Sequence, residues 1–126
     1  MKLSAVPVCL GLAASAFAAD CLGGNYEGKP STSAYWEARK KMCSNQDGCL
    51  WQQPCTTYGK EAFPQLGSGI NFYVSLTRSN YGGAKGFKDC LDATRDMINQ
   101  CHNGDGSYDS TWSYNGQYFK FHAYPQ

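Results

Sequence analysis

Five residues in two segments carry side chains suited to binding carbohydrate: Asn71, Tyr73, Tyr118, Lys120 and His122. Sugars present apolar C–H faces and rings of hydroxyl groups. A site for them therefore needs an exposed aromatic ring for stacking and amide, hydroxyl or charged groups for hydrogen bonds. The competing interpretation is that a helix covers Tyr73 and Tyr118, because tyrosine is intermediate in its preference for burial. Looser aromatic candidates are Trp51, Tyr81 and Tyr124.

A second chemistry to weigh is RNA hydrolysis, for which small extracellular ribonucleases use a carboxylate, one or two histidines and an arginine. The chain contains Glu61, Arg78, His102 and His122, a set able to supply a base, an acid and a phosphate clamp. Nothing in their spacing requires them to converge. His102 is predicted to lie at the carboxyl end of a helix, where a positive charge is favourable for structural reasons alone. We therefore expect these residues to be structural, and we assign no catalytic residue.

Metal and cofactor chemistry is not expected. The cysteines lack the paired Cys-x2-Cys spacing of zinc sites, and the two histidines stand at no ligand spacing. The aspartates Asp89, Asp92 and Asp96 could line one helix face, but Lys88 and Arg95 stand beside them. A solvated, neutralised face is the better interpretation of this cluster.

Residues 1–19 have the pattern of a cleavable signal peptide. Lys2 precedes an uncharged, largely apolar stretch that ends in small residues, which favours cleavage after Ala18 or Ala19. A membrane anchor is the weaker interpretation, because Pro7 interrupts the stretch and no stop-transfer charges follow it. We expect a secreted, extracellular protein.

Removal of this segment takes Cys9 with it and changes the cysteine count from seven to six. The remaining cysteines are Cys21, Cys43, Cys49, Cys55, Cys90 and Cys101. An even number in a short secreted chain predicts disulfides. Because oxidised cysteines are not nucleophiles, catalysis by a cysteine is not expected.

Residues 20–126 are predicted to form a single cysteine-rich domain. Loss of Lys2 leaves ten lysines and arginines against ten aspartates and glutamates, so no net charge attracts the domain to nucleic acid or to a membrane surface. Neither nucleic-acid binding nor membrane insertion is expected, and the sequence leaves a homodimer open.

Periodicity and turn residues predict the secondary structure of an α+β domain. They give a helix over 34–43, a disulfide-stapled loop over 44–64, a strand over 70–77 and a second helix from 88 or 89 to 101. The stripe that the second helix would bury consists of Leu91, Thr94, Ile98 and Cys101. Asn103 and Gly104 are predicted to end that helix in a left-handed conformation.

Asn115 and Gly116 stand between two aromatic runs, which is a strong signal for a two-residue hairpin turn. Such a turn places Tyr114 opposite Gln117, Ser113 opposite Tyr118 and Trp112 opposite Phe119. The predicted core face is Trp112, Phe119 and Phe121, and the predicted wet face is Ser113, Tyr118, Lys120 and His122.

The second predicted helix also limits the disulfide pairing. Cys90 and Cys101 are eleven positions apart, which at the α-helical rise is about 16 Å. A disulfide needs Cα atoms within about 7 Å. Of the roughly 15 pairings open to six cysteines, those that join Cys90 to Cys101 are excluded, and the others stay open.

The carboxy-terminal half resembles a known family. Residues 88–101 (KDCLDATRDMINQC), a glycine-bearing loop and residues 111–118 (TWSYNGQY) resemble the Y3-like family of small, secreted, cysteine-rich fungal glycan-binding proteins. The resemblance implies a compact, disulfide-stapled α/β sandwich that binds fucosylated glycans containing N-acetylgalactosamine without catalysis. A similar helix and hairpin also occur in fungal necrosis-inducing effectors and killer-toxin-like proteins. A secreted effector or toxin is therefore the alternative function, ahead of a ribonuclease.

Overall fold

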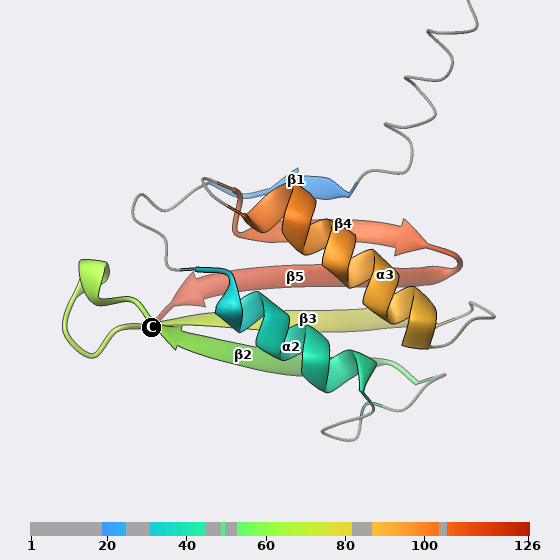
Figure 1. Ribbon diagram of the computed structural model, residues 1–126, viewed down its shortest axis with the longest axis horizontal. Helices are drawn as coiled ribbons and strands as arrows, with labels where there is room; N and C mark the ends of the chain where they lie inside the picture. Colours follow the sequence, from blue (N-terminus) through green and yellow to red (C-terminus); the bar gives the residue numbers. More distant parts are fainter. Residues whose placement is uncertain (1–18, 25–30, 45–48, 50–52, 82–86, 104–105) are drawn as a thin grey trace, which may run out of the picture.

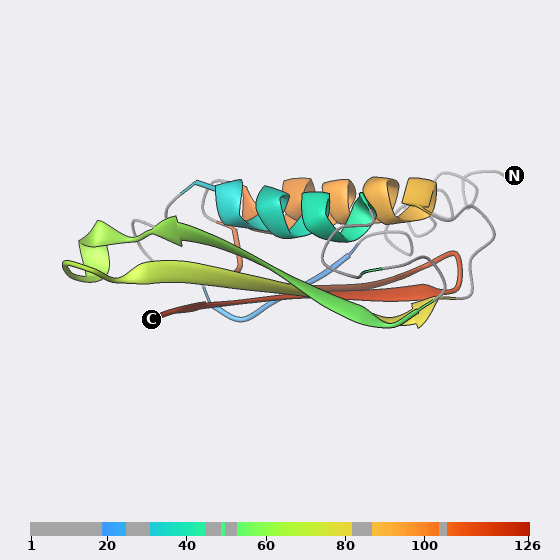
Figure 2. The same cartoon turned by 90° about the horizontal axis from the view of Figure 1, so that it is seen from below.

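A computed structural model describes residues 19–24, 31–44, 49, 53–81, 87–103 and 106–126. The elements in chain order are β1 Asp20–Leu22, α2 Ser33–Cys43, β2 Cys55–Ala62, β3 Asn71–Tyr81, α3 Phe87–Met97, β4 Asp109–Tyr114 and β5 Gln117–Pro125. The two helices lie side by side on one face of the sheet (Figure 1), and the view along the sheet shows two layers (Figure 2). The predicted α+β fold with two main helices and an antiparallel sheet is confirmed.

The sheet has five antiparallel strands in the order β1-β4-β5-β3-β2. Its centre is the long pair β3 and β5, which runs from Phe72 opposite Pro125 to Tyr81 opposite Gln117. The register shifts once in this pair, between Arg78 and Asn80. The short β1 and the longer β2 form the two edges.

The core lies between the helices and the sheet. Phe72, Val74 and Leu76 of β3 and Phe119 and Phe121 of β5 are fully buried, while the residues between them are more exposed. From the helix layer, Tyr35, Ala38 and Met42 of α2 are buried against them. Among the described residues, no second layer covers the opposite face of the sheet (Figure 2).

Helix α2 is held against β2 by polar contacts rather than by apolar side chains. The Glu61 carboxylate accepts hydrogen bonds from Ala34 N at 2.6 Å and from Ser33 Oγ at 2.7 Å, so it caps the helix from the neighbouring strand. Thr57 Oγ1 donates to the Ala38 carbonyl oxygen at 2.6 Å. Between these residues, Gly59 lies directly under the helix, where a Cβ atom would be 1.9 Å from the Ala34 carbonyl oxygen.

Three of the four residues of the predicted stripe, Thr94, Ile98 and Cys101, are buried as predicted. Leu91 is 37% exposed, so its assignment to the core was wrong, and α3 buries Cys90, Ala93 and Met97 in addition. The helix continues into a π-helical turn, Ile98–His102, that ends at Asn103 with φ −72°. Asn103 is therefore extended and not left-handed, and Gly104 lies outside the described residues.

Three disulfides join the elements: Cys21–Cys101, Cys43–Cys90 and Cys49–Cys55. The first ties β1 to the π-helical turn, and the second joins the two helices. The prediction that Cys90 does not pair with Cys101 is confirmed. Among the residues that the structure describes, no helix has the length and apolar character needed to cross a membrane.

The hairpin prediction is confirmed and the loop prediction is wrong in part. Asn115 and Gly116 both have positive φ angles, 51° and 84°, and the three predicted cross-strand pairs are present. The segment assigned to a stapled loop over 44–64 instead contains β2, Cys55–Ala62, as an edge strand of the sheet.

Candidate functional site

The face of the sheet opposite α2 and α3, called the open face below, carries polar and aromatic side chains from β2, β3, β4 and β5. Residues paired across strands share a face, and those between the buried positions point away from the helices. The open face comprises Tyr58 and Lys60 of β2, Asn71, Tyr73, Ser75 and Thr77 of β3, Asp109, Thr111 and Ser113 of β4, and Tyr118, Lys120, His122 and Tyr124 of β5.

Three rings on this face form a continuous series, called the aromatic row below: Tyr73, Tyr124 and His122. Tyr73 and Tyr124 are paired across β3 and β5, with ring centroids 5.7 Å apart and planes inclined by 18°. Tyr124 and His122 are 5.6 Å apart, with planes inclined by 29°. Tyr73 and Tyr124 are partly exposed and His122 is exposed, so the row can be reached from solvent.

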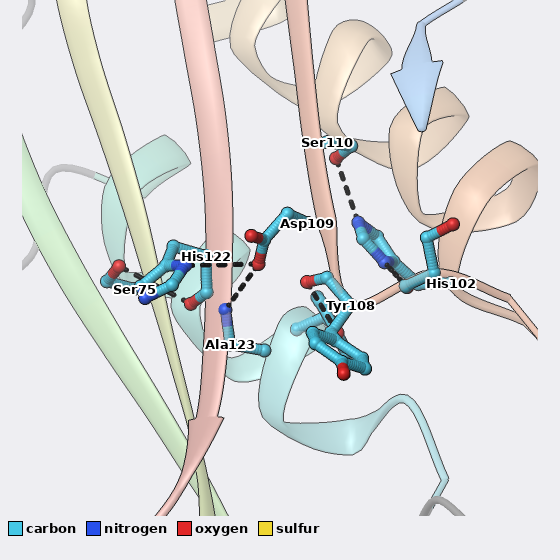
Figure 3. Close-up of polar contacts among 9 residues, drawn as sticks. Ser75, His102, Tyr108, Asp109, Ser110, His122 and Ala123 are labelled. Atoms are coloured by element: carbon cyan, nitrogen blue, oxygen red, sulfur yellow. Dashed lines mark hydrogen bonds and ion pairs between the residues drawn. The ribbon is translucent and has the colours of Figure 1, made fainter. Parts of the chain in front are cut away.

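His122 is held in one orientation by Asp109 on the neighbouring strand. His122 Nδ1 lies 3.1 Å from Asp109 Oδ1, and the same oxygen accepts the Ala123 backbone N–H at 3.0 Å (Figure 3). A carboxylate oxygen only accepts hydrogen bonds, so the proton of the neutral ring is on Nδ1. Nε2 has no partner among the described residues and is available as an acceptor on the open face.

Ser75, His122 and Asp109 lie on three adjacent strands, and their types are those of a hydrolytic triad, but their geometry is not. Ser75 Oγ donates to the backbone carbonyl oxygen of His122 at 3.4 Å and not to the ring nitrogen (Figure 3). The backbone N–H groups of these strands lie in the plane of the sheet, so they do not point toward a group placed above Ser75. Asp109 orients the imidazole, and the Ser75 hydroxyl takes no part in that contact.

Lysine ammonium groups and threonine hydroxyls flank the aromatic row. Lys60 is paired with Tyr73, and Lys120 is paired with Thr77 on one side and Thr111 on the other. Both lysines are exposed. Hydrogen-bond donors and acceptors therefore surround rings that can stack, the combination that sugar recognition requires.

The five predicted binding residues, Asn71, Tyr73, Tyr118, Lys120 and His122, all lie on the open face. The interpretation in which a helix covers Tyr73 and Tyr118 is wrong, since both helices lie on the other face and Tyr118 is 36% exposed (Figure 2). Tyr73 and His122 come together in the aromatic row. Asn71 and Tyr118 lie toward opposite ends of the face.

Sequence reasoning undervalued three members of the face. Tyr124 was only a loose candidate, although it continues the alternation of Tyr118, Lys120 and His122 along β5. Tyr58, 53% exposed, and Lys60 were assigned to a loop. The side chains of the other loose candidates, Trp51 and Tyr81, lie outside the described residues.

The residues weighed for RNA hydrolysis are not brought together. Arg78 is buried on the helix side of the sheet, where Nη2 donates to the Gln53 carbonyl oxygen at 2.7 Å and burial lowers the pKa of the guanidinium. Glu61 caps α2, as described above. His122 is on the open face, and His102 is on the other side of the sheet.

His102 is a core residue. Its ring is fully buried and stacks on Tyr35, with centroids 4.1 Å apart and planes inclined by 18°. Nδ1 contacts the Ser107 carbonyl oxygen, which can only accept, and Nε2 lies 2.8 Å from Ser110 Oγ. The ring thus joins the end of α3 to the start of β4, which supports the structural interpretation.

The aspartates of α3 do not form a cation site. Asp92 and Asp96 pair with Arg95 at 3.8 Å and 3.1 Å. Asp89 is buried rather than solvated as expected, and its carboxylate accepts from Asn115 Nδ2 at 3.2 Å and Gln117 Nε2 at 3.5 Å. Within the described part of the chain, no three His, Cys, Asp or Glu side chains are placed to hold a metal ion.

Comparison of the chain with protein families, with curated proteins and with solved structures gives no match.

Proposed function

We propose that this chain is a secreted fungal lectin-like protein that binds glycans or glycoproteins without catalysis, through the open face of its sheet. The glycan class follows the resemblance to the Y3-like family: oligosaccharides that contain N-acetylgalactosamine and fucose. The observation that carries the proposal is the aromatic row of Tyr73, Tyr124 and His122 on the face of the sheet opposite α2 and α3.

The chemistry of the row fits a sugar ligand. The partly exposed tyrosine rings give apolar surface for the C–H face of a pyranose, and His122 Nε2 accepts a hydrogen bond from a hydroxyl group. Lys60 and Lys120 donate from either side of the row. Because Asp109 already fixes the imidazole, less side-chain entropy is lost on binding than for a free histidine.

The three disulfides support the secreted part of the proposal, since such bonds persist in oxidising compartments. The two helices and the disulfide between them stabilise the side of the sheet that faces away from the aromatic row (Figure 1). Substitutions on the open face should therefore alter binding with little effect on folding.

The test is a glycan array with the refolded mature protein, followed by affinity measurements on variants. Tyr124→Ala and Tyr73→Ala should each weaken binding about tenfold, which corresponds to about 1.4 kcal/mol. Leu91→Ala is the matched control, because this residue is also exposed and apolar but lies on α3 behind the sheet. Absence of binding to any glycan at micromolar concentration would remove the lectin function.

Tyr118→Ala maps the extent of the site. Tyr118 lies on the open face but outside the aromatic row, next to Ser113 at the hairpin end. A loss of affinity similar to that of Tyr124→Ala would show that the bound ligand reaches past Lys120 to this end. An unchanged affinity would confine the ligand to the aromatic row and exclude Tyr118 from the site.

The alternative functions give different results in the same preparation. A secreted effector or toxin would release dye from lipid vesicles or bind a protein partner, and it would bind no glycan. A ribonuclease would degrade RNA, whereas a lectin-like protein would leave RNA intact after long exposure.

A further inference from the structure

The first described residue of the chain, Ala19, is part of the folded domain. It is only 9% exposed and belongs to the core cluster. Its backbone nitrogen lies 2.9 Å from Oε1 of Gln100, which follows it by 81 positions in the chain. The next residues, Asp20–Leu22, are exposed and pair with β4. Ala19 is therefore buried and hydrogen-bonded, whereas the side chains of the strand it precedes are exposed.

The anchor lies at the end of a helix. Gln100 is part of the π-helical turn Ile98–His102, which continues α3, and the adjacent Cys101 is bonded to Cys21. Backbone carbonyl groups at the carboxyl end of a helix carry a partial negative charge that favours a nearby cation. An amino terminus at Ala19 would place an ammonium group beside this end, with a neutral amide oxygen as its acceptor.

We propose that the peptide bond between Ala18 and Ala19 is hydrolysed during secretion, and that the new α-ammonium group of Ala19 is held by Gln100 Oε1. Water is the co-reactant: its oxygen joins the Ala18 carbonyl carbon, the C–N bond breaks, and protons pass to the leaving nitrogen. This inference rests on the secreted part of the proposed function and is independent of glycan binding.

Two independent features favour this bond over the next one. Ala16 and Ala18 are the small residues of an Ala-x-Ala signal, whereas cleavage after Ala19 would put Phe17 at the position that requires a small residue. Cleavage after Ala19 would also remove the buried methyl group and the hydrogen bond to Gln100. It would leave the charged terminus on the exposed Asp20.

The first experiment is to express the full chain, with its own amino-terminal segment, in a yeast secretion host. Intact mass and amino-terminal sequencing are then measured on the protein in the medium. A sequence that begins Ala-Asp-Cys supports the inference. A sequence that begins at Asp20 overturns it while leaving secretion in place. A chain that keeps Met1 or stays in the cell overturns both it and the secreted part of the proposed function, and glycan binding can still be assayed separately.

A second experiment tests the acceptor. In the secreted protein, Gln100→Leu should raise the labelling rate of the α-amino group by an amine-reactive reagent at neutral pH about threefold, because a bond that favours the protonated amine is lost. Gln65→Leu is the matched control, since Gln65 is exposed on the short turn Pro64–Leu66. Equal labelling rates in the two variants and the wild type would overturn the assignment of Gln100.

Discussion

Gly59→Ala tests how closely α2 lies on the sheet. Gly59 is buried in β2 beneath the first turn of α2, and its α-carbon faces the helix. A Cβ atom added there would lie 1.9 Å from the Ala34 carbonyl oxygen and 2.8 Å from the Ala34 carbonyl carbon. Because the atoms it meets belong to the helix backbone, no side-chain rotation can relieve the clash.

The cost of this substitution follows from the contact distance. Real Cβ atoms essentially never approach within 3.0 Å of another heavy atom in this way. Helix and strand must therefore separate by about 1 Å, a shift typical of overpacked cores that cost about 1–3 kcal/mol. The movement also stretches the hydrogen bond from Ala34 N to Glu61. We therefore expect the free energy of unfolding to fall by about 3 kcal/mol, the upper end of that range. For a domain of this size, the midpoint Tm then falls by roughly 10 to 20 °C.

Thermal unfolding followed by circular dichroism measures this effect on the oxidised protein. Gly24→Ala is the matched control: its Cβ atom would meet Tyr108 Oη at 3.4 Å, an ordinary contact. We expect the control to unfold within about 4 °C of the wild type. A Gly59→Ala variant with an equally small change would show that α2 does not lie on β2 in this way.

Three further perturbations have expected outcomes. Glu61→Ala removes the cap of α2 and should lower the free energy of unfolding by about 1–2 kcal/mol in a urea titration. Lys41→Ala uncovers the β2 edge and should produce dimers or aggregates in size-exclusion chromatography, whereas Lys40→Ala should stay monodisperse like the wild type. The double variant Cys43→Ala/Cys90→Ala opens a bridge between residues 47 positions apart, and denaturation should show a loss of about 4 kcal/mol. A loss under about 1 kcal/mol would contradict the bridge.

The sequence predicts best the elements whose pattern is set locally. The hairpin at Asn115 and Gly116 was predicted to the residue, because both positions take positive φ angles that few other residue pairs tolerate. The β3 strand was predicted because Phe72, Val74 and Leu76 alternate with polar residues. In both cases residues that are close in the sequence determine the local structure.

Strand β2 was missed because the residues that it turns toward α2 are not apolar. Thr57, Gly59 and Glu61 occupy the helix side: one hydrogen-bonds a helix carbonyl, one makes room for the helix and one caps it. An alternation of apolar and polar side chains is therefore absent, although the strand is fully paired with β3. Only knowledge of where α2 lies would reveal this strand.

The buried side of α3 was predicted only in part for a related reason: Thr94, Ile98 and Cys101 were assigned correctly and Leu91 was not. Cys90 is buried because it is bonded to Cys43, and Asp89 because Asn115 and Gln117 of the hairpin donate to its carboxylate. Both partners are distant in the chain, so the helical period of apolar residues alone selected Leu91 instead. The sequence predicted which residues of the hairpin lie on the open face. It predicted only some of the other side chains on that face.

The edges of the sheet restrict how the protein can recognise a partner. At the β2 edge, the Tyr58 carbonyl oxygen accepts from Lys41 Nζ at 2.9 Å and the Lys60 N–H donates to Glu37 Oε1 at 2.9 Å. Glu37 and Lys41 are themselves 3.5 Å apart one helical turn from each other, so α2 occupies backbone groups that an added strand would need. Recognition by strand addition is thus disfavoured at this edge. The glycan binding proposed above uses side chains of the open face, where the aromatic row lies, and does not need this edge.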